Sequence, residues 1–112
     1  MLVGIAGGDA NYLKIVDDTL EELIENSGVY IFTIFDAQIK GSIHTDPTLA
    51  HLYSQLRGLP CRTKQYNTFD ALVRGICKEV DYLIILNNNS QQIKRLFMSY
   101  KQTGKHGSVI NI

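Results

Sequence analysis

The stretch DYLIILNNNSQQIKRLFMSYKQTGKHGSVINI, residues 81–112, decides the fold class. It holds two short apolar runs, Leu83–Leu86 and Val109–Ile112, with an amphipathic segment between them. Runs this short and this apolar are typical of parallel strands buried on both faces, and they do not suit hairpin strands with one face in solvent. The stretch therefore predicts a strand, a crossover helix and a second strand. The polar turn at residues 87–90 then lies at the carboxyl end of a strand, where open α/β sheets bind ligands.

The same alternation of strands and helices extends back to the start of the sequence. It requires right-handed crossovers and a mostly parallel sheet covered on both faces. We expect one domain over residues 1–112, a Rossmann-like three-layer α/β/α sandwich with a five-stranded, mostly parallel sheet and the first strand at its centre. The expected strands are Leu2–Ala6, Val29–Phe35, Cys61–Gln65, Tyr82–Leu86 and Ser108–Ile112, and the expected helices are Ala10–Asn26, a segment opened by Asp46-Pro47 and stopped by Gly58, Phe69–Lys78 and Ser90–Thr103.

Turn and cap residues set several of these boundaries. Gly28 suits a left-handed conformation at the end of the first helix. Pro47 fits the first turn of the second helix, with Thr45 or Asp46 as its cap. Thr68 is the expected cap of the third helix.

Charge and hydropathy exclude some classes of partner. Lys plus Arg and Asp plus Glu both number 11, so the formal charge is zero, whereas nucleic-acid binders usually carry a basic excess. We therefore expect no nucleic-acid partner. The chain shows no long apolar segment and no signal-peptide pattern, which predicts a cytoplasmic protein without a membrane partner. A net charge near zero gives little colloidal repulsion, so self-association is expected.

The sequence offers no convincing catalytic or metal-binding motif. Neither the G-x-x-x-x-G-K-[ST] P-loop nor the G-x-G-x-x-G dinucleotide fingerprint is present. His44, His51 and His106 show no metal-ligand spacing with cysteines or carboxylates. Cys61 and Cys77 are interpreted as buried free thiols, and the closeness of His51 to Cys61 in sequence is not taken as a nucleophile pair. We predict no catalytic residue, no metal and no cofactor.

The order of elements and one longer motif resemble a known family. The motif is D-x-x-L-A-x-x-Y-x-x-x-x-G-x-P, formed here by Asp46, Leu49, Ala50, Tyr53, Gly58 and Pro60. Gly104, Lys105, Val109 and Ile112 follow in the last connection and strand. This order resembles the SLOG superfamily, the Rossmann-like nucleotide-binding domains related to the LOG phosphoribohydrolases and DprA proteins, and above all its small stand-alone bacterial and phage members. The resemblance covers nearly the whole chain.

Departures from the family pattern limit what the resemblance implies. Small SLOG proteins carry G-G-A-x-G-A-D after the second strand, whereas the expected polar loop Asp36–Thr45 keeps one glycine, Gly41. Glycine allows backbone amides to approach a phosphate closely, so phosphate cradling is weakened. Asp9 stands where the family has an arginine after the first strand. The P-G-G-x-G-T-x-x-E motif of LOG enzymes is absent, so the resemblance does not imply an enzyme.

These observations favour non-catalytic binding of a nucleotide or nucleotide-derived small molecule, in signalling or phage–host conflict, by a homodimer or higher homo-oligomer. Two alternatives stay open: a phage- or plasmid-type protein-interaction module with an empty degenerate pocket, and a hydrolase or transferase acting on the glycosidic bond of nucleosides. The expected ligand-binding residues are Gly7, Gly8, Asp9, Asn11, Tyr12, Asp36, Lys40, Gly41, Ser42, His44, Asp46, Asn87, Asn88, Asn89 and Ser90.

Several of these residues also have a purely structural interpretation. Asp9 suits a helix cap as well as a ribose contact. Tyr12 suits packing over the sheet edge as well as stacking on a base. His44 suits an exposed loop position as well as a ligand contact. The asparagines at 87–89 suit left-handed turns and caps as well as hydrogen bonds to a sugar or base edge.

Overall fold

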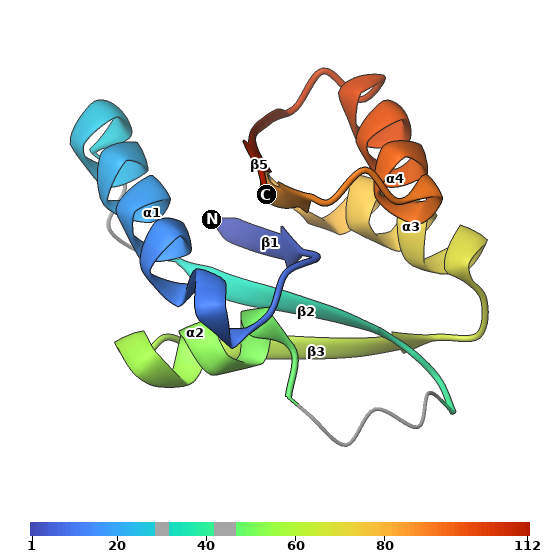
Figure 1. Cartoon of the computed structure of the whole chain (residues 1–112), viewed down its shortest axis with the longest axis horizontal. Helices are drawn as coiled ribbons and strands as arrows, with labels where there is room; N and C mark the ends of the chain where they lie inside the picture. The colour runs from blue at the N-terminus through green and yellow to red at the C-terminus, as the bar shows by residue number, and fades with distance from the viewer. Residues whose placement is uncertain (29–31, 42–46) are drawn as a thin grey trace.

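The chain folds around a parallel sheet. The computed structural model describes residues 1–28, 32–41 and 47–112. Within them the sheet has five strands in the order β3-β2-β1-β4-β5, and all four neighbouring pairs are parallel (Figure 1). The elements are β1 Leu2–Ala6, the 3-10 helix η1 Ala10–Tyr12, α1 Leu13–Ser27, β2 Thr33–Ile39, α2 Leu49–Arg57, β3 Cys61–Tyr66, α3 Phe69–Glu79, β4 Tyr82–Asn87, α4 Gln91–Lys101 and β5 His106–Asn111.

Helices cover both faces of the sheet, which confirms the predicted α/β sandwich with β1 at its centre (Figure 1). Helices α1 and α2 pack on one face through a core that includes Val16, Leu20 and Tyr53. Helices α3 and α4 pack on the other through a core that includes Ile76 and Leu96. The strand β4 contributes to both cores from alternate positions, as a strand buried on both faces must.

The second strand differs from the expectation. It runs to Ile39 and does not end at Phe35, so residues 36–39 are strand and not loop. Asp36 is buried in that strand, at 1% relative exposure. The predicted start of the strand at Val29 and the later part of the predicted loop lie outside the described residues.

Helix caps agree with the prediction in part. Gly28 ends α1 in the left-handed region with φ 69°, and Thr68 caps α3 by accepting from the Ala71 N–H. The cap of α2 is Thr48 and not Thr45 or Asp46, which lie outside the described residues. A 3-10 turn precedes α1, so the helix proper begins at Leu13.

Lys105 ties the last connection to the end of α3. Its ammonium donates to the carbonyl oxygens of Cys77, Lys78 and Val80 at 2.8, 3.1 and 3.1 Å. The last carbonyls of a helix lack intrahelical donors and carry partial negative charge, so a cation stabilises them. This lysine therefore has a structural function.

Two further predictions concern the cysteines and membrane insertion. Cys61 and Cys77 are both free, as expected, but each is half-buried and not fully buried. No helix in the described part of the chain is long and apolar enough to cross a membrane.

Candidate functional site

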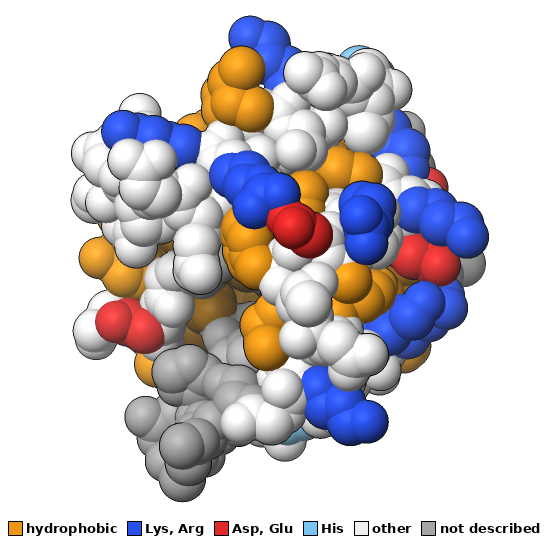
Figure 2. Space-filling view, turned by 90° about the vertical axis from the view of Figure 1, so that its right-hand side faces the viewer, with side chains coloured by type: hydrophobic (Ala, Val, Ile, Leu, Met, Phe, Trp, Pro, Cys, Tyr) orange, Lys and Arg blue, Asp and Glu red, His pale blue; other side chains and the backbone are white. Residues whose placement is uncertain are grey.

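A cleft of about 500 Å³ opens at the carboxyl ends of β1, β2 and β4. The turn after β1, the second half of β2 and the turn before α4 all border it. Figure 2 faces this edge of the molecule and shows hydrophobic side chains within a recess, with Lys and Arg side chains around it. The position agrees with the rule that open α/β sheets bind ligands beyond the carboxyl ends of their strands.

The inner wall of the cleft is apolar. Phe69, Leu72 and Ile76 come from α3, Leu96 comes from α4 and Leu83 comes from β4. These side chains belong to the core between the sheet and helices α3 and α4, so the cleft penetrates between the sheet and its cover. An apolar wall of this kind suits the flat face of an aromatic or heterocyclic ring.

The rim of the cleft is polar and mostly uncharged. The carboxamides of Gln38, Gln65, Asn88 and Gln92 line it, each of which can both donate and accept. None of the described lining residues is Lys, Arg or His.

A cation nearby is already engaged. Arg95 lies over the Phe69 ring, with its guanidinium 5.9 Å from the ring centroid, and forms an ion pair with Asp70. Its charge is therefore paired with that of Asp70 beside Phe69, and Arg95 is not one of the lining residues.

Gly7 and Gly8 bring bare backbone to the rim. Both adopt positive φ, at 80° and 73°, which L side chains rarely do. A Cβ at Gly7 would stand 2.7 Å from the Leu86 carbonyl oxygen, and one at Gly8 would stand 3.0 Å from side-chain carbons of Leu49 and Leu86. These glycines are thus required by the turn itself, whether or not a ligand approaches them.

Asp36 is the one charged side chain among the described lining residues, and it is held by neighbours. Its Oδ1 accepts from the Thr48 hydroxyl at 2.7 Å, and its Oδ2 accepts from Gln38 Nε2 at 2.9 Å. The Thr63 hydroxyl makes a longer contact of 3.5 Å to Oδ2. A buried carboxylate needs such donors, because desolvation without them is costly.

The structure brings only part of the predicted site together. The predicted residues that line the cleft are Gly7, Gly8, Asp36, Gly41, Asn88 and Ser90. The predicted residues that do not line it are Asp9, Asn11, Tyr12, Lys40, Asn87 and Asn89. Ser42, His44 and Asp46 lie outside the described residues.

Local hydrogen bonds account for several polar side chains. Asp9 Oδ1 accepts from the Asn11 N–H at 2.9 Å, which caps the 3-10 turn. Asn87 accepts from the Asn89 N–H at 3.0 Å, and Asn89 takes the left-handed region with φ 63°. Asn88 accepts from the Ser90 N–H at 3.0 Å. The turn before α4 is therefore organised by its own side chains.

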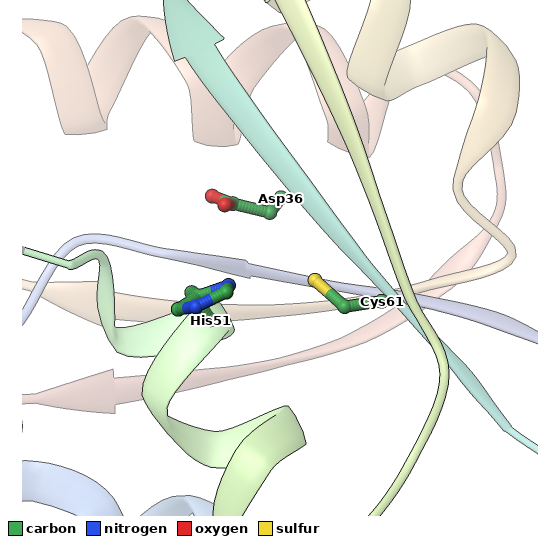
Figure 3. A group of neighbouring side chains, drawn as sticks. All are labelled: Asp36, His51 and Cys61. Carbon is green, nitrogen blue, oxygen red and sulfur yellow. The ribbon is translucent and has the colours of Figure 1, made fainter.

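Sequence reasoning missed two groups of residues. The first is the apolar wall from α3 and α4, whose spacing signals helix burial without distinguishing a core from a cleft wall. The second is a cluster of Asp36, His51 and Cys61, one residue each from β2, α2 and β3 (Figure 3). Only the crossover between two neighbouring strands brings these three side chains together.

Comparisons with known proteins give no information on the function. A scan against protein families finds no match, and a search of curated proteins finds none either. The resemblance to the SLOG superfamily therefore rests on the motifs quoted above.

Proposed function

We propose that this protein binds a nucleoside-like small molecule, a planar base carrying a hydroxylated sugar, in the cleft at the carboxyl ends of β1, β2 and β4, without converting it. The observation that carries the proposal is the combination of an apolar wall with an uncharged carboxamide rim in one cleft of about 500 Å³. Ligand pockets of about 300–1,000 Å³ typically pair apolar walls with a few polar groups that fix orientation.

The charges of the residues that line the cleft favour a ligand with few phosphates. No described lining residue carries a positive charge, and Asp36 carries a negative one. The Thr48 and Ser90 side chains accept from the N–H groups of His51 and Ile93, so they occupy amides that would otherwise attract an anion. A neutral nucleoside or a monophosphate fits this field better than a triphosphate.

The cleft also bears on the alternatives. An interaction module with an empty degenerate pocket would show the same open cleft, so the ligand screen below separates that alternative from a binding protein. A hydrolase or transferase needs an acid or base free to act on the substrate. The described lining residues hold one carboxylate, Asp36, and no His, Lys or Cys that could act with it as an acid–base pair, which favours binding over turnover.

A ligand screen by thermal shift tests the proposal. We would screen adenosine, guanosine, cytidine and uridine with their monophosphates and triphosphates, because a ligand that binds only the folded state stabilises it by mass action. At a concentration of 100 times Kd the expected stabilisation is about 2.7 kcal/mol. We expect at least one nucleoside to stabilise the protein and its triphosphate to do so less.

A cleft-filling variant links the stabilisation to this site. Ala37 lies in β2, faces α3 and lines the cleft, so Ala37→Leu places a larger side chain in the ligand space. Ala10→Leu, at an exposed position outside the cleft, is the matched control. Loss of the nucleoside effect in the first variant alone supports the proposal. Equal stabilisation of both variants, or triphosphates binding better than nucleosides, would contradict it.

A further inference from the structure

Asp36, His51 and Cys61 form a cluster of three different metal-ligand types. One ligand atom from each lies within 4.8 Å of the other two. Figure 3 shows the side chains directed toward a common space from β2, α2 and β3. No signal in the sequence indicated this cluster, because the spacing of these residues along the chain matches no metal-binding motif.

The fold fixes the positions of these residues. Ile34 pairs with Cys61, and Asp36 pairs with Thr63 two positions further along. Side chains two positions apart on a strand point to the same face, so Asp36 and Cys61 lie on one face of the two neighbouring strands. This is the face that α2 covers, since Ile34 belongs to the core beneath α1 and α2. His51 lies in the first turn of α2, three residues after the cap residue Thr48.

We propose that Asp36, His51 and Cys61 bind a divalent transition-metal ion of the zinc class. A thiolate, an imidazole and a carboxylate are the three side-chain ligand types that Zn²⁺ takes, whereas Mg²⁺ and Ca²⁺ prefer oxygen alone. Three protein ligands leave a fourth tetrahedral position for water or another donor.

The surroundings of Asp36 resemble the outer shell of a metal ligand. Ligating carboxylates are usually oriented by further hydrogen bonds. Here Thr48 orients Oδ1 and Gln38 orients Oδ2, at 2.7 and 2.9 Å. Each carboxylate oxygen has two lone pairs, so Oδ1 keeps one for a metal. Asp36 is 1% exposed and takes part in none of the ion pairs among the described residues, so its negative charge lacks a cationic partner there.

The distances require only local adjustment. Bond lengths of about 2.0–2.3 Å place the donors of a tetrahedral zinc site roughly 3.4–3.6 Å apart. The cluster spans at most 4.8 Å, so a contraction of at most about 1.4 Å completes the site. His51 and Cys61 are only half-buried, which leaves their side chains room to rotate toward Asp36.

Co²⁺ binding to the metal-free, reduced protein tests the site directly. Tetrahedral cobalt with a thiolate ligand shows visible d–d bands and a near-ultraviolet thiolate-to-cobalt charge-transfer band. We expect both bands to saturate at one equivalent of Co²⁺ and to disappear when Zn²⁺ is added. Absence of the bands at one equivalent would overturn the proposal.

Matched variants assign the ligands. Cys61→Ser should abolish the charge-transfer band and weaken Zn²⁺ binding by more than the roughly 10–100-fold typical of losing an outer-shell partner. Cys77→Ser should keep the band, since Cys77 lies on α3 outside the cluster. His51→Gln should weaken binding in the same way, and His106→Gln should not. Binding that survives both Cys61→Ser and His51→Gln is adventitious and overturns the proposal.

Metal binding and nucleoside binding are tested by separate experiments. Asp36 borders both, but the nucleoside screen is run with chelator present, and the cobalt titration is run without nucleoside. A chain that binds nucleosides but no Co²⁺ would refute the metal site alone.

Discussion

The Thr48 hydroxyl lies 2.7 Å from Asp36 Oδ1 and donates to it, while accepting from the His51 N–H at 3.1 Å. One side chain thus caps α2, satisfies a buried carboxylate of β2 and positions the turn of α2 that carries His51. Asp36 and Thr48 both line the cleft, and Asp36 also belongs to the proposed metal site.

We predict that Thr48→Ala destabilises the protein more than an ordinary loss of a cap. Removal of a cap lowers the free energy of unfolding by about 1 kcal/mol. Leaving a buried charged acceptor without one of its donors lowers it by about 1–3 kcal/mol more. Thr68→Ala is the control, because Thr68 caps α3 from an exposed position through its bond to the Ala71 N–H. Urea denaturation would measure both. Equal losses would show that the Asp36 bond contributes nothing.

Lys105→Met should lower the free energy of unfolding by about 2 kcal/mol, since hydrogen bonds from charged donors contribute about 1.5–3 kcal/mol. The substitution keeps an unbranched, flexible side chain that is one atom shorter and removes the donor to three carbonyls around the end of α3. Lys101→Met, at an exposed position over Phe97, should change stability by less than about 0.5 kcal/mol. A Lys105 variant as stable as the Lys101 variant would refute this capping function.

Tyr66→Phe should be neutral or should stabilise the fold by up to about 1 kcal/mol. The Tyr66 hydroxyl is buried, and no described residue offers it a hydrogen-bond partner. Tyr100→Phe is the contrasting variant, because the Tyr100 hydroxyl donates to the His106 carbonyl at 2.6 Å. Tyr100→Phe should lower the free energy of unfolding by about 1 kcal/mol. If chemical denaturation shows the opposite order, the hydroxyl of Tyr66 has a partner in solution.

Alkaline pH should destabilise the protein through Tyr100. Burial, with Asp81 nearby, raises the pKa of Tyr100 to about 12. An unfolded tyrosine ionises near pH 10, so the unfolded chain releases this proton first. The stabilisation from Tyr100 is thus complete below pH about 10 and is lost as pH rises to about 12, by about 2–3 kcal/mol in total.

Urea denaturation from pH about 9 to about 11.5 would measure this loss. Tyr100→Phe should flatten the decline in stability over that range. Part of the decline should remain, because burial and the hydrogen bond to Asp17 also raise the pKa of Tyr53. An unchanged slope in the variant would contradict the assignment to Tyr100.

The fold was predictable because its signals are local. Short apolar runs such as Leu83–Leu86 indicate strands buried on both faces, and the alternation with helices leaves few topologies. The end of β2 was not predictable in this way. Aspartate disfavours strands, so Asp36 marked a loop, yet hydrogen bonds from Thr48 and Gln38 hold it within the strand. Thr48, which caps α2, lies 12 residues from Asp36 in sequence.

The site was predictable only where topology alone places residues. The glycines after β1 and the turn at Asn88 lie at carboxyl ends of parallel strands, and they line the cleft as expected. The apolar wall that includes Leu72 and Leu96 could not be predicted without knowing how α3 and α4 pack on the sheet. The cluster of Asp36, His51 and Cys61 required the register of β2 against β3, which the sequence does not encode in any short motif.

Residue-resolved NMR can show whether a nucleoside occupies the cleft. The ¹⁵N-labelled protein, with chelator present, would be titrated with whichever of the four nucleosides stabilises it most. We predict saturable shifts of the backbone amides of Gly7, Gly8 and Asn88 and of the side-chain amide of Gln65, with the exposed face of α1 unaffected. Shifts confined to α1 or β5, or none with any of the four nucleosides, would show that no nucleoside binds in the cleft.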